Sequence, residues 1–109
     1  MAKLALQEKG QTNQICFHTQ QVAEKYLKGF LVYSGEKFEK VHQLRYLLQL
    51  CAKIDASFEE LREDVIYLMR FYIETRYPGE FPDFSSAEAQ KAYEAARRVK
   101  NFVLQEIKK

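Results

Sequence analysis

The stretch Cys16-Phe17-His18-Thr19-Gln20-Gln21-Val22-Ala23-Glu24-Lys25-Tyr26-Leu27-Lys28 joins a helical repeat of apolar residues to an unusual set of polar ones. Its apolar side chains recur every three or four positions, which places them on one side of an α-helix. We therefore predict a long helix whose broad apolar face packs against several neighbours. That face comprises Ile15, Thr19, Val22, Ala23, Tyr26, Leu27, Phe30 and Tyr33.

The residues around this stretch indicate where the long helix begins and ends. Gly10 separates it from a short first helix predicted over residues 2–9, and the side chain of Thr12 or Asn13 is placed to cap its start. Gly35 is predicted to end it, because glycine readily adopts the left-handed backbone conformation that follows many helices.

Two helices are predicted in the middle of the chain. Residues 41–53 carry a stripe with helical spacing, formed by Leu44, Leu47, Leu48 and Cys51. Ser57 and Glu60 then have the spacing of a capping box, which predicts a fourth helix that runs to about Tyr77, just before Pro78. Its predicted buried face contains Phe58, Leu61, Val65, Leu68, Met69 and Tyr72.

A second capping box, from Ser85 to Glu88, predicts the start of the last helix. No segment alternates with the period of a strand, and every connection is short. We therefore predict an all-α fold, an antiparallel up-and-down bundle of four to five helices that forms a single domain over residues 1–109. The inner side of the last helix is predicted to carry Ala89, Ala92, Ala96, Val99, Val103 and Ile107.

The composition is that of a soluble globule, with 47% hydrophobic residues and a formal net charge of only +2. So small a charge predicts weak general attraction to a phosphate backbone. Cys16 and Cys51 lack the spacing of a zinc site or a redox pair, so we expect two buried, reduced thiols and neither a metal nor a cofactor. No signal peptide or membrane span is apparent, which predicts a cytoplasmic protein with no membrane partner.

Opposite the apolar face, the long helix carries a polar stripe rich in hydrogen-bond donors. It is either a solvated helix surface or a site for a phosphate, a nucleotide or an acidic partner surface. The stripe consists of Gln14, His18, Gln21, Lys25 and Lys28.

A flank of the same helix mixes large apolar side chains with a carboxylate and an amide, and two aromatic residues point away from the core of the fourth helix. These positions predict a homodimer interface. The alternative is that one bundle wraps far enough to bury them. The flank contains Phe17, Gln20, Glu24, Leu27 and Leu31, and the aromatic residues are Tyr67 and Phe71.

Arg76 shares a face with apolar residues at the predicted end of the fourth helix. One interpretation is that its guanidinium covers the last backbone carbonyls of the helix. The other is that it binds an anion such as phosphate, with Tyr77, Phe81 or Phe84 offering a ring on which a base can stack.

Three separated motifs resemble the HEPN domain, a family of small helical bundles often paired with minimal nucleotidyltransferases. The helix motif of that family runs approximately H-x-Q-Q-x-A-E-K-x-L-K, and residues 18–28 match it. His42 and Leu44 resemble the start of its next helix, and Arg76-Tyr77-Pro78 resembles its R-Y-P ending. The resemblance implies three themes: metal-independent RNA cleavage, partnership with a nucleotidyltransferase in a toxin–antitoxin type of pair, and nucleotide binding without catalysis.

HEPN ribonucleases resemble one another in an arginine followed four to six residues later by a histidine that serves as acid or base. Here the first arginine, Arg45, comes after both histidines, so the chain lacks this motif. The leading hypothesis is therefore a non-catalytic, dimeric HEPN domain that binds a nucleotide or partners a minimal nucleotidyltransferase. Its predicted ligand-binding residues are His18, Gln21, Lys25, Arg76 and Tyr77.

The competing hypothesis is a metal-independent ribonuclease toxin with a divergent active site. Arg70 and Tyr77 are separated by an interval comparable to that of the nuclease motif, and Arg76 lies beside them in sequence. Tyrosine is a poor acid or base near neutral pH because its pKa is ordinarily about 10. A third hypothesis is an interaction module whose polar stripe has no ligand.

Overall fold

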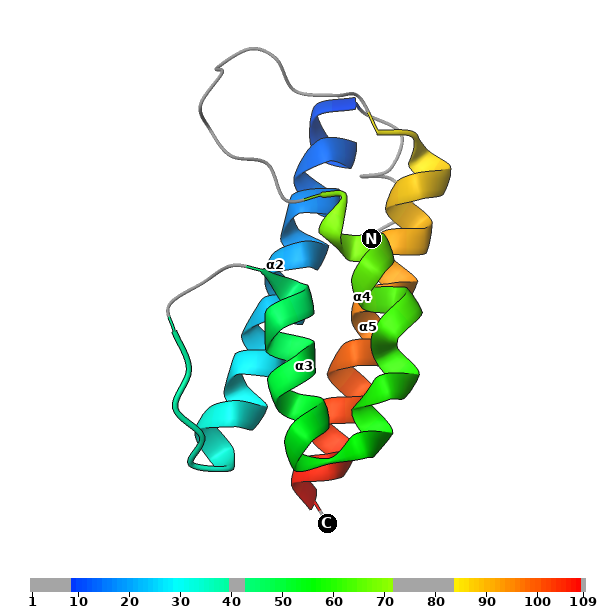
Figure 1. The fold of residues 1–109 in the computed structure, drawn as a ribbon. Helices are drawn as coiled ribbons and strands as arrows, with labels where there is room; N and C mark the ends of the chain where they lie inside the picture. The colour runs from blue at the N-terminus through cyan, green and yellow to red at the C-terminus, as the bar shows by residue number, and fades with distance from the viewer. Residues whose placement is uncertain (1–8, 40–42, 72–83, 109) are drawn as a thin grey trace.

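A computed structural model describes residues 9–39, 43–71 and 84–108, and these residues form a bundle of helices with no strand among them (Figure 1). The all-α helical bundle predicted from the sequence is therefore confirmed. The predicted first helix lies outside the described residues except for its last position, Lys9. The helices are α2 (Lys9–Tyr33), α3 (Leu44–Ile54), α4 (Arg62–Met69) and α5 (Ser86–Lys108), with the 3-10 segment η1 (Ala56–Leu61) before α4.

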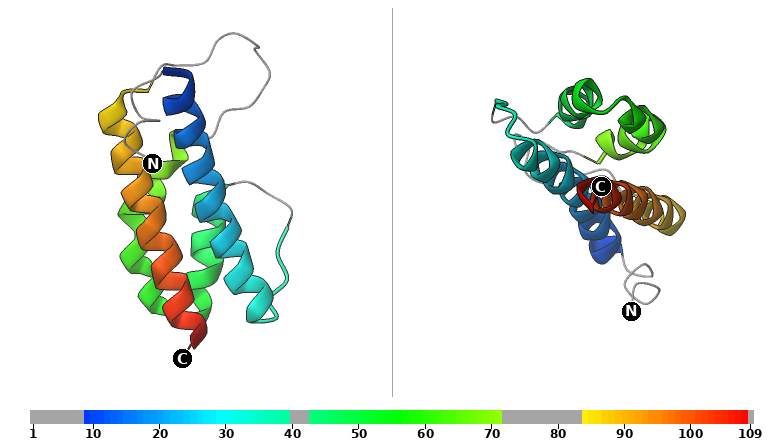
Figure 2. Two further views of the ribbon diagram at one scale, coloured as in Figure 1. Left: turned by 180° about the vertical axis from the view of Figure 1, so that it is seen from behind. Right: turned by 90° about the horizontal axis from the view of Figure 1, so that it is seen from below.

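The helices form two layers, with α2 beside α5 in one and α3 beside α4 in the other (Figure 2). Helices α2 and α5 run in the same direction, and near their C-terminal ends the Tyr33 hydroxyl donates a hydrogen bond to the backbone oxygen of Ile107 (3.1 Å). Helix α4 runs the opposite way. The direction of the helices therefore does not alternate throughout as expected, because α3 starts partway along α2 and runs parallel to it.

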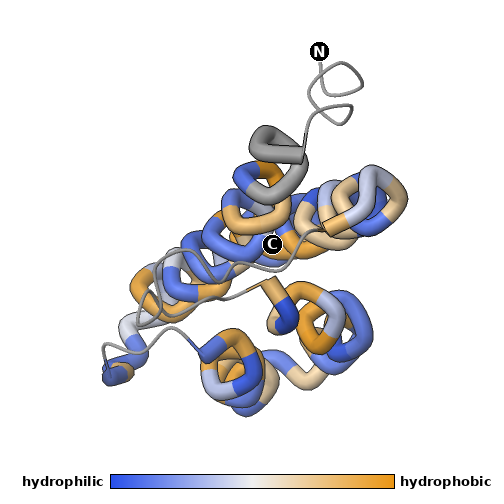
Figure 3. The backbone as a smooth tube through the Cα atoms, turned by 90° about the horizontal axis from the view of Figure 1, so that it is seen from above, coloured by the Kyte–Doolittle hydropathy of each residue, from blue (hydrophilic) through white to orange (hydrophobic). Residues whose placement is uncertain are grey.

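Buried apolar residues of the four helices and η1 form one core cluster. Figure 3 shows the hydropathy of each residue along the backbone of the two layers. The ring of Phe58 lies 4.4 Å from that of Phe30 and 4.9 Å from that of Phe102, so it joins α2, η1 and α5. The predicted apolar stripe of α3 is confirmed, since all four of its residues are buried. On α5 the buried residues are Ala89, Ala92, Ala95, Ala96, Val99 and Val103, of which all but Ala95 were predicted.

Helix α2 begins earlier than predicted. Its backbone is helical from Lys9 through Gly10 to Asn13, so a break at Gly10 and a cap at Thr12 or Asn13 are wrong. One glycine costs a helix only about 1 kcal/mol relative to alanine, which a helix packed along its length can offset.

The end of α2 is as predicted. Gly35 has a positive φ of 75°, and its N–H donates to the oxygen of Val32 (3.0 Å). The N–H of Glu36 reaches the oxygen of Leu31 (2.9 Å). This pair of hydrogen bonds is the Schellman arrangement, which satisfies carbonyls that the helix itself leaves without partners.

The predicted capping box at Ser57 and Glu60 is wrong. Asp55 caps this segment instead, because its carboxylate accepts hydrogen bonds from the backbone N–H (3.0 Å) and the hydroxyl (2.6 Å) of Ser57. An aspartate two positions before a serine forms a compact local turn with it. Asp55 therefore accepts the hydrogen bond from the Ser57 N–H that Glu60 would have accepted in a capping box. Residues 56–61 therefore adopt a 3-10 segment, and α4 starts only at Arg62.

Helix α4 is shorter than predicted, since it ends at Met69 and a turn follows at Arg70 and Phe71. The predicted end at Tyr77 lies outside the described residues. The second capping box is confirmed: the N–H of Ser85 donates to the carboxylate of Glu88, and the N–H of Glu88 donates to the Ser85 hydroxyl, both at 3.0 Å.

The corrected cap makes a prediction about stability. We expect Asp55→Ala to lower the free energy of unfolding by about 1 kcal/mol, because two hydrogen bonds to Ser57 are lost. The matched variant Glu60→Ala removes an exposed carboxylate and should change it by less than about 0.5 kcal/mol. Urea unfolding measures both. A larger loss from Glu60→Ala than from Asp55→Ala would contradict the observed cap.

Candidate functional site

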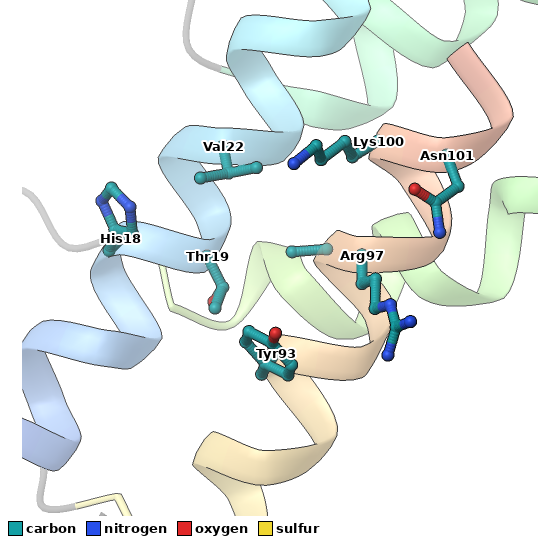
Figure 4. A pocket seen from close by; sticks show the side chains of 8 residues that line it. His18, Thr19, Val22, Tyr93, Arg97, Lys100 and Asn101 are labelled. Atoms are coloured by element: carbon teal, nitrogen blue, oxygen red, sulfur yellow. The ribbon is translucent and has the colours of Figure 1, made fainter. Parts of the chain in front are cut away.

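A hollow with a volume of about 270 Å³ lies between α2 and α5 (Figure 4). We call it the α2–α5 furrow. Helix α2 contributes His18, Thr19 and Val22. Helix α5 contributes Tyr93, Ala96, Arg97, Lys100 and Asn101.

The base of the furrow is set by how the two helices pack. Ala96 is a small, buried residue of α5, and small side chains let neighbouring helices approach closely. Thr19 is also buried, and its hydroxyl donates a 2.7 Å hydrogen bond to the backbone oxygen of Cys16. The hydroxyl is therefore satisfied within its own helix, which leaves the side chains at the rim to contact a ligand.

Three nitrogen-bearing side chains, those of His18, Arg97 and Lys100, give the furrow its electrostatic character. All three residues are exposed, and in the part of the chain that the structure describes none of them forms an ion pair. No carboxylate lines the hollow among the described residues. The furrow is therefore a region of uncompensated positive charge beside an apolar base.

Figure 4 shows how these side chains are directed. Lys100 reaches across from α5 toward α2, whereas the His18 imidazole and the Arg97 guanidinium point away from each other on opposite sides of the furrow. Tyr93 presents a ring that is 45% exposed. This arrangement suits the binding of an anion with an attached aromatic ring. The arrangement does not bring the His18 imidazole and the Arg97 guanidinium together.

The structure separates the predicted ligand-binding residues. His18 lines the furrow, while Gln21 and Lys25 are exposed on α2 without lining it. Arg76 and Tyr77 lie outside the described residues. The remaining residues of the predicted polar stripe are Gln14, which is exposed, and Lys28, which pairs with Glu24 at 2.8 Å.

The residues that α5 brings to the furrow were not predicted from the sequence. Tyr93, Arg97 and Lys100 recur at positions i, i+4 and i+7, a spacing that places them on one stripe of the helix. That spacing is visible in the sequence. The spacing places these residues on one stripe of α5, but it does not show which helix packs beside that stripe. Only the packing of α5 against α2 shows that these residues share a hollow with His18.

Several residues of the predicted dimer interface are buried within one chain. Gln20 is 3% exposed, Leu31 is fully buried and Phe71 is 1% exposed. Leu27 of the same flank is also buried. For these residues the structure supports the alternative interpretation, in which the bundle itself covers them.

The other predicted interface residues are half-buried and have partners within the chain. Phe17 packs edge to face against Phe84 at 6.1 Å, and Glu24 accepts hydrogen bonds from Gln20 and Lys28. Their surfaces leave less area for a second chain than the helical pattern suggested.

Tyr67 is held between α4 and α5 by several contacts. Its ring lies 4.3 Å from the Arg70 guanidinium and 4.9 Å from the Lys91 ammonium, and its hydroxyl donates to the backbone oxygen of Glu88 (3.1 Å). Burial is the main cause that raises the pKa of Tyr67. The phenol therefore stays protonated at neutral pH and acts as a hydrogen-bond donor.

A second hollow of about 300 Å³ lies between α4 and α5. Two of its three charged residues are already paired, since the Arg98 guanidinium binds both oxygens of the Asp64 carboxylate at 2.7 and 2.9 Å, and the third, Glu60, is exposed. The described ranges contain no group of three or more histidine, cysteine or acidic residues that could hold a metal ion. Within the same ranges, no helix has the length and apolar character needed to cross a membrane.

The chain matches the family model of the HEPN domain over residues 1–107. It belongs to the HEPN family. No curated protein and no solved structure is significantly similar to it. The family match covers both helices of the furrow, and it agrees with the resemblance carried by the motif of residues 18–28.

The two thiols of this HEPN domain are predicted to be inert. Burial raises the pKa of Cys51 to about 12, and burial together with the nearby Glu88 carboxylate raises that of Cys16 to about 11. At pH 8 both thiols are protonated and inaccessible, so Ellman's reagent should leave the native protein unmodified and modify both in urea. Rapid modification of either thiol in the native protein would contradict this.

Proposed function

We propose that this HEPN domain is a non-catalytic binding protein that holds the phosphate group of a nucleotide in the α2–α5 furrow. The observation that carries the proposal is that one hollow is lined by an exposed aromatic ring and by basic side chains that form no ion pair with the residues the structure describes. Phosphate oxygens accept charge-assisted hydrogen bonds from lysine and arginine, which are about twice as strong as those between neutral groups.

Each residue of the furrow has a role in this proposal. The Lys100 ammonium reaches over the hollow and contacts the phosphate, and Arg97 adds a second positive charge at the rim. Tyr93 stacks on the base, an interaction worth about 1–3 kcal/mol per base. His18 donates a hydrogen bond from the opposite side. These contacts do not require a particular base, so the proposal concerns nucleotides as a class.

Partnership with a minimal nucleotidyltransferase, in a toxin–antitoxin type of pair, is a second proposal, and it rests on the family resemblance. The exposed stripe of Gln14, Gln21 and Lys25 offers that partner a polar surface beside the furrow. We further propose that the domain acts in the cytoplasm and forms a homodimer. Because Gln20, Leu31 and Phe71 are buried within one chain, such a dimer would have to use other surfaces.

The competing ribonuclease proposal gains one observation from the fold. Although no arginine precedes a histidine in the sequence, the packing of α5 on α2 brings Arg97 and His18 to the same furrow. Their side chains point away from each other in Figure 4, which favours binding over catalysis. Incubation of RNA with the pure protein in EDTA tests this proposal. Cleavage that His18→Ala abolishes would establish it and overturn the non-catalytic one.

The nucleotide proposal is tested by calorimetric titration with ATP. We expect the wild type to bind ATP, and Lys100→Ala to weaken binding about tenfold or more, because a charge-assisted contact worth about 1.5–3 kcal/mol is lost. Arg97→Ala and Tyr93→Ala should each weaken it by a smaller factor.

Arg62→Ala is the matched control, since it removes a positive charge that already pairs with Glu59, on a helix that does not line the furrow. It should bind ATP as the wild type does. Absence of binding by the wild type at millimolar ATP would refute the nucleotide proposal, and an equal loss in Arg62→Ala would show only a general effect of charge.

A further inference from the structure

The face formed by α2 and α5 is not covered by α3 or α4, which lie on the other side of the bundle (Figure 2). We infer that this face binds an acidic amphipathic helix of a partner protein, laid along the continuation of the furrow toward the C-terminal ends of α2 and α5. The inference goes beyond nucleotide binding, because it adds residues outside the hollow, among them Gly29, Tyr33 and Leu104.

Gly29 is the first observation. It lies in the interior of α2, where glycine costs about 1 kcal/mol relative to alanine. It is exposed, and a Cβ atom built on it would meet no other atom within 4 Å. Among the described residues, no neighbour packs so closely against position 29 that only a glycine would fit there. What the glycine leaves is open space on the surface, into which a partner's side chain can enter.

The second observation is the spacing of the residues around that space. On α2, Val22, Tyr26, Gly29 and Tyr33 recur at i, i+4, i+7 and i+11. On α5, Tyr93, Arg97, Lys100 and Leu104 recur with the same spacing. The helices run in the same direction (Figure 1), and they meet at the hollow and again at the hydrogen bond from Tyr33 to Ile107, so the two stripes lie side by side. We call the strip of surface between them the groove. A third helix with apolar residues every three or four positions fits such a groove.

The exposed apolar side chains favour a protein helix as the occupant. Tyr33 is 61% exposed and Leu104 is 36% exposed, and both lie beyond the hollow toward the C-terminal ends of their helices. Together with Gly29 they form an apolar part of the groove near the C-terminal ends of α2 and α5. The hydrogen bond from the Tyr33 hydroxyl to the backbone oxygen of Ile107 holds the tyrosine in place. Nucleic acid would place charged phosphates or solvated sugars there and would gain little from these side chains.

The basic residues beside the groove indicate that the partner helix is acidic. Lys25, Arg97 and Lys100 border the groove and form no ion pair with any residue that the structure describes. A second copy of the chain related by a two-fold axis would bring these like charges together, which costs free energy. A helix with glutamate or aspartate beside its apolar stripe neutralises them instead. The partner is therefore acidic.

The test uses two synthetic helical peptides with the same leucine stripe, flanked by glutamates in one and by lysines in the other. Fluorescence anisotropy measures their binding to the full chain. We expect the glutamate peptide to bind at least about tenfold more tightly than the lysine peptide. Equal binding of the two peptides, or binding of neither, would overturn the inference.

Substitutions at Gly29 show where the peptide binds. Gly29→Gln fills the open space without adding charge and should weaken the binding of the glutamate peptide about tenfold. Gly29→Ala adds only a methyl group and should change the affinity of that peptide less than about threefold. Both variants should unfold at a higher temperature than the wild type, because glutamine and alanine favour a helix more than glycine does. Unchanged peptide binding by Gly29→Gln would overturn the inference.

Three further measurements separate this inference from its alternatives. ATP titration of Gly29→Gln should match the wild type, so failure of the peptide test and failure of the nucleotide proposal remain distinct. If Gly29→Gln instead disrupted self-association in analytical ultracentrifugation, the occupant would be a second copy. If it weakened binding of single-stranded RNA as much as that of the peptide, the occupant would be nucleic acid. Either of these last two results would overturn the inference.

Discussion

The close packing of α5 against α2 is the contact on which the other features of this HEPN domain depend. The buried side of α5 is rich in alanine, with Ala89, Ala92, Ala95 and Ala96 all within the core. Alanine buries little area per residue, so α5 gains its stability from a long, close contact and not from a few large side chains. Phe58 contributes bulk at one end, between Phe30 and Phe102. The same close approach creates the furrow on the outer side of the two helices.

Helix rotation assigns different roles to residues that are neighbours in the sequence. Arg97 and Arg98 are adjacent, yet about 100° of helix rotation separates them. Arg98 faces α4 and pairs with Asp64, whereas Arg97 lines the furrow without an ion pair among the described residues. On α2, Lys28 pairs with Glu24 while Lys25 remains exposed. The small net charge of the chain therefore conceals a local concentration of positive charge on one face.

Features that depend on neighbours along the chain could be predicted from the sequence. The capping box of Ser85 and Glu88, the left-handed Gly35 and the apolar stripe of α3 each involve residues within one or two helical turns. Where two local signals compete, the sequence predicted the wrong one, since Asp55 and not Ser57 is the cap. Burial that depends on helix packing was also predicted wrongly, since Gln20 and Leu31 lie on a surface flank of an isolated helix but inside the bundle.

By itself, the sequence determined the helical class and the family, because periodicity and the motif of residues 18–28 are properties of the chain that no packing alters. Only the tertiary structure decided where the candidate site lies. His18 belongs to the motif, but Tyr93, Arg97 and Lys100 come from the other end of the chain. They meet His18 because α5 returns alongside α2 in the same direction, and the pairing of distant helices is set by the shape of their buried faces and not by local sequence.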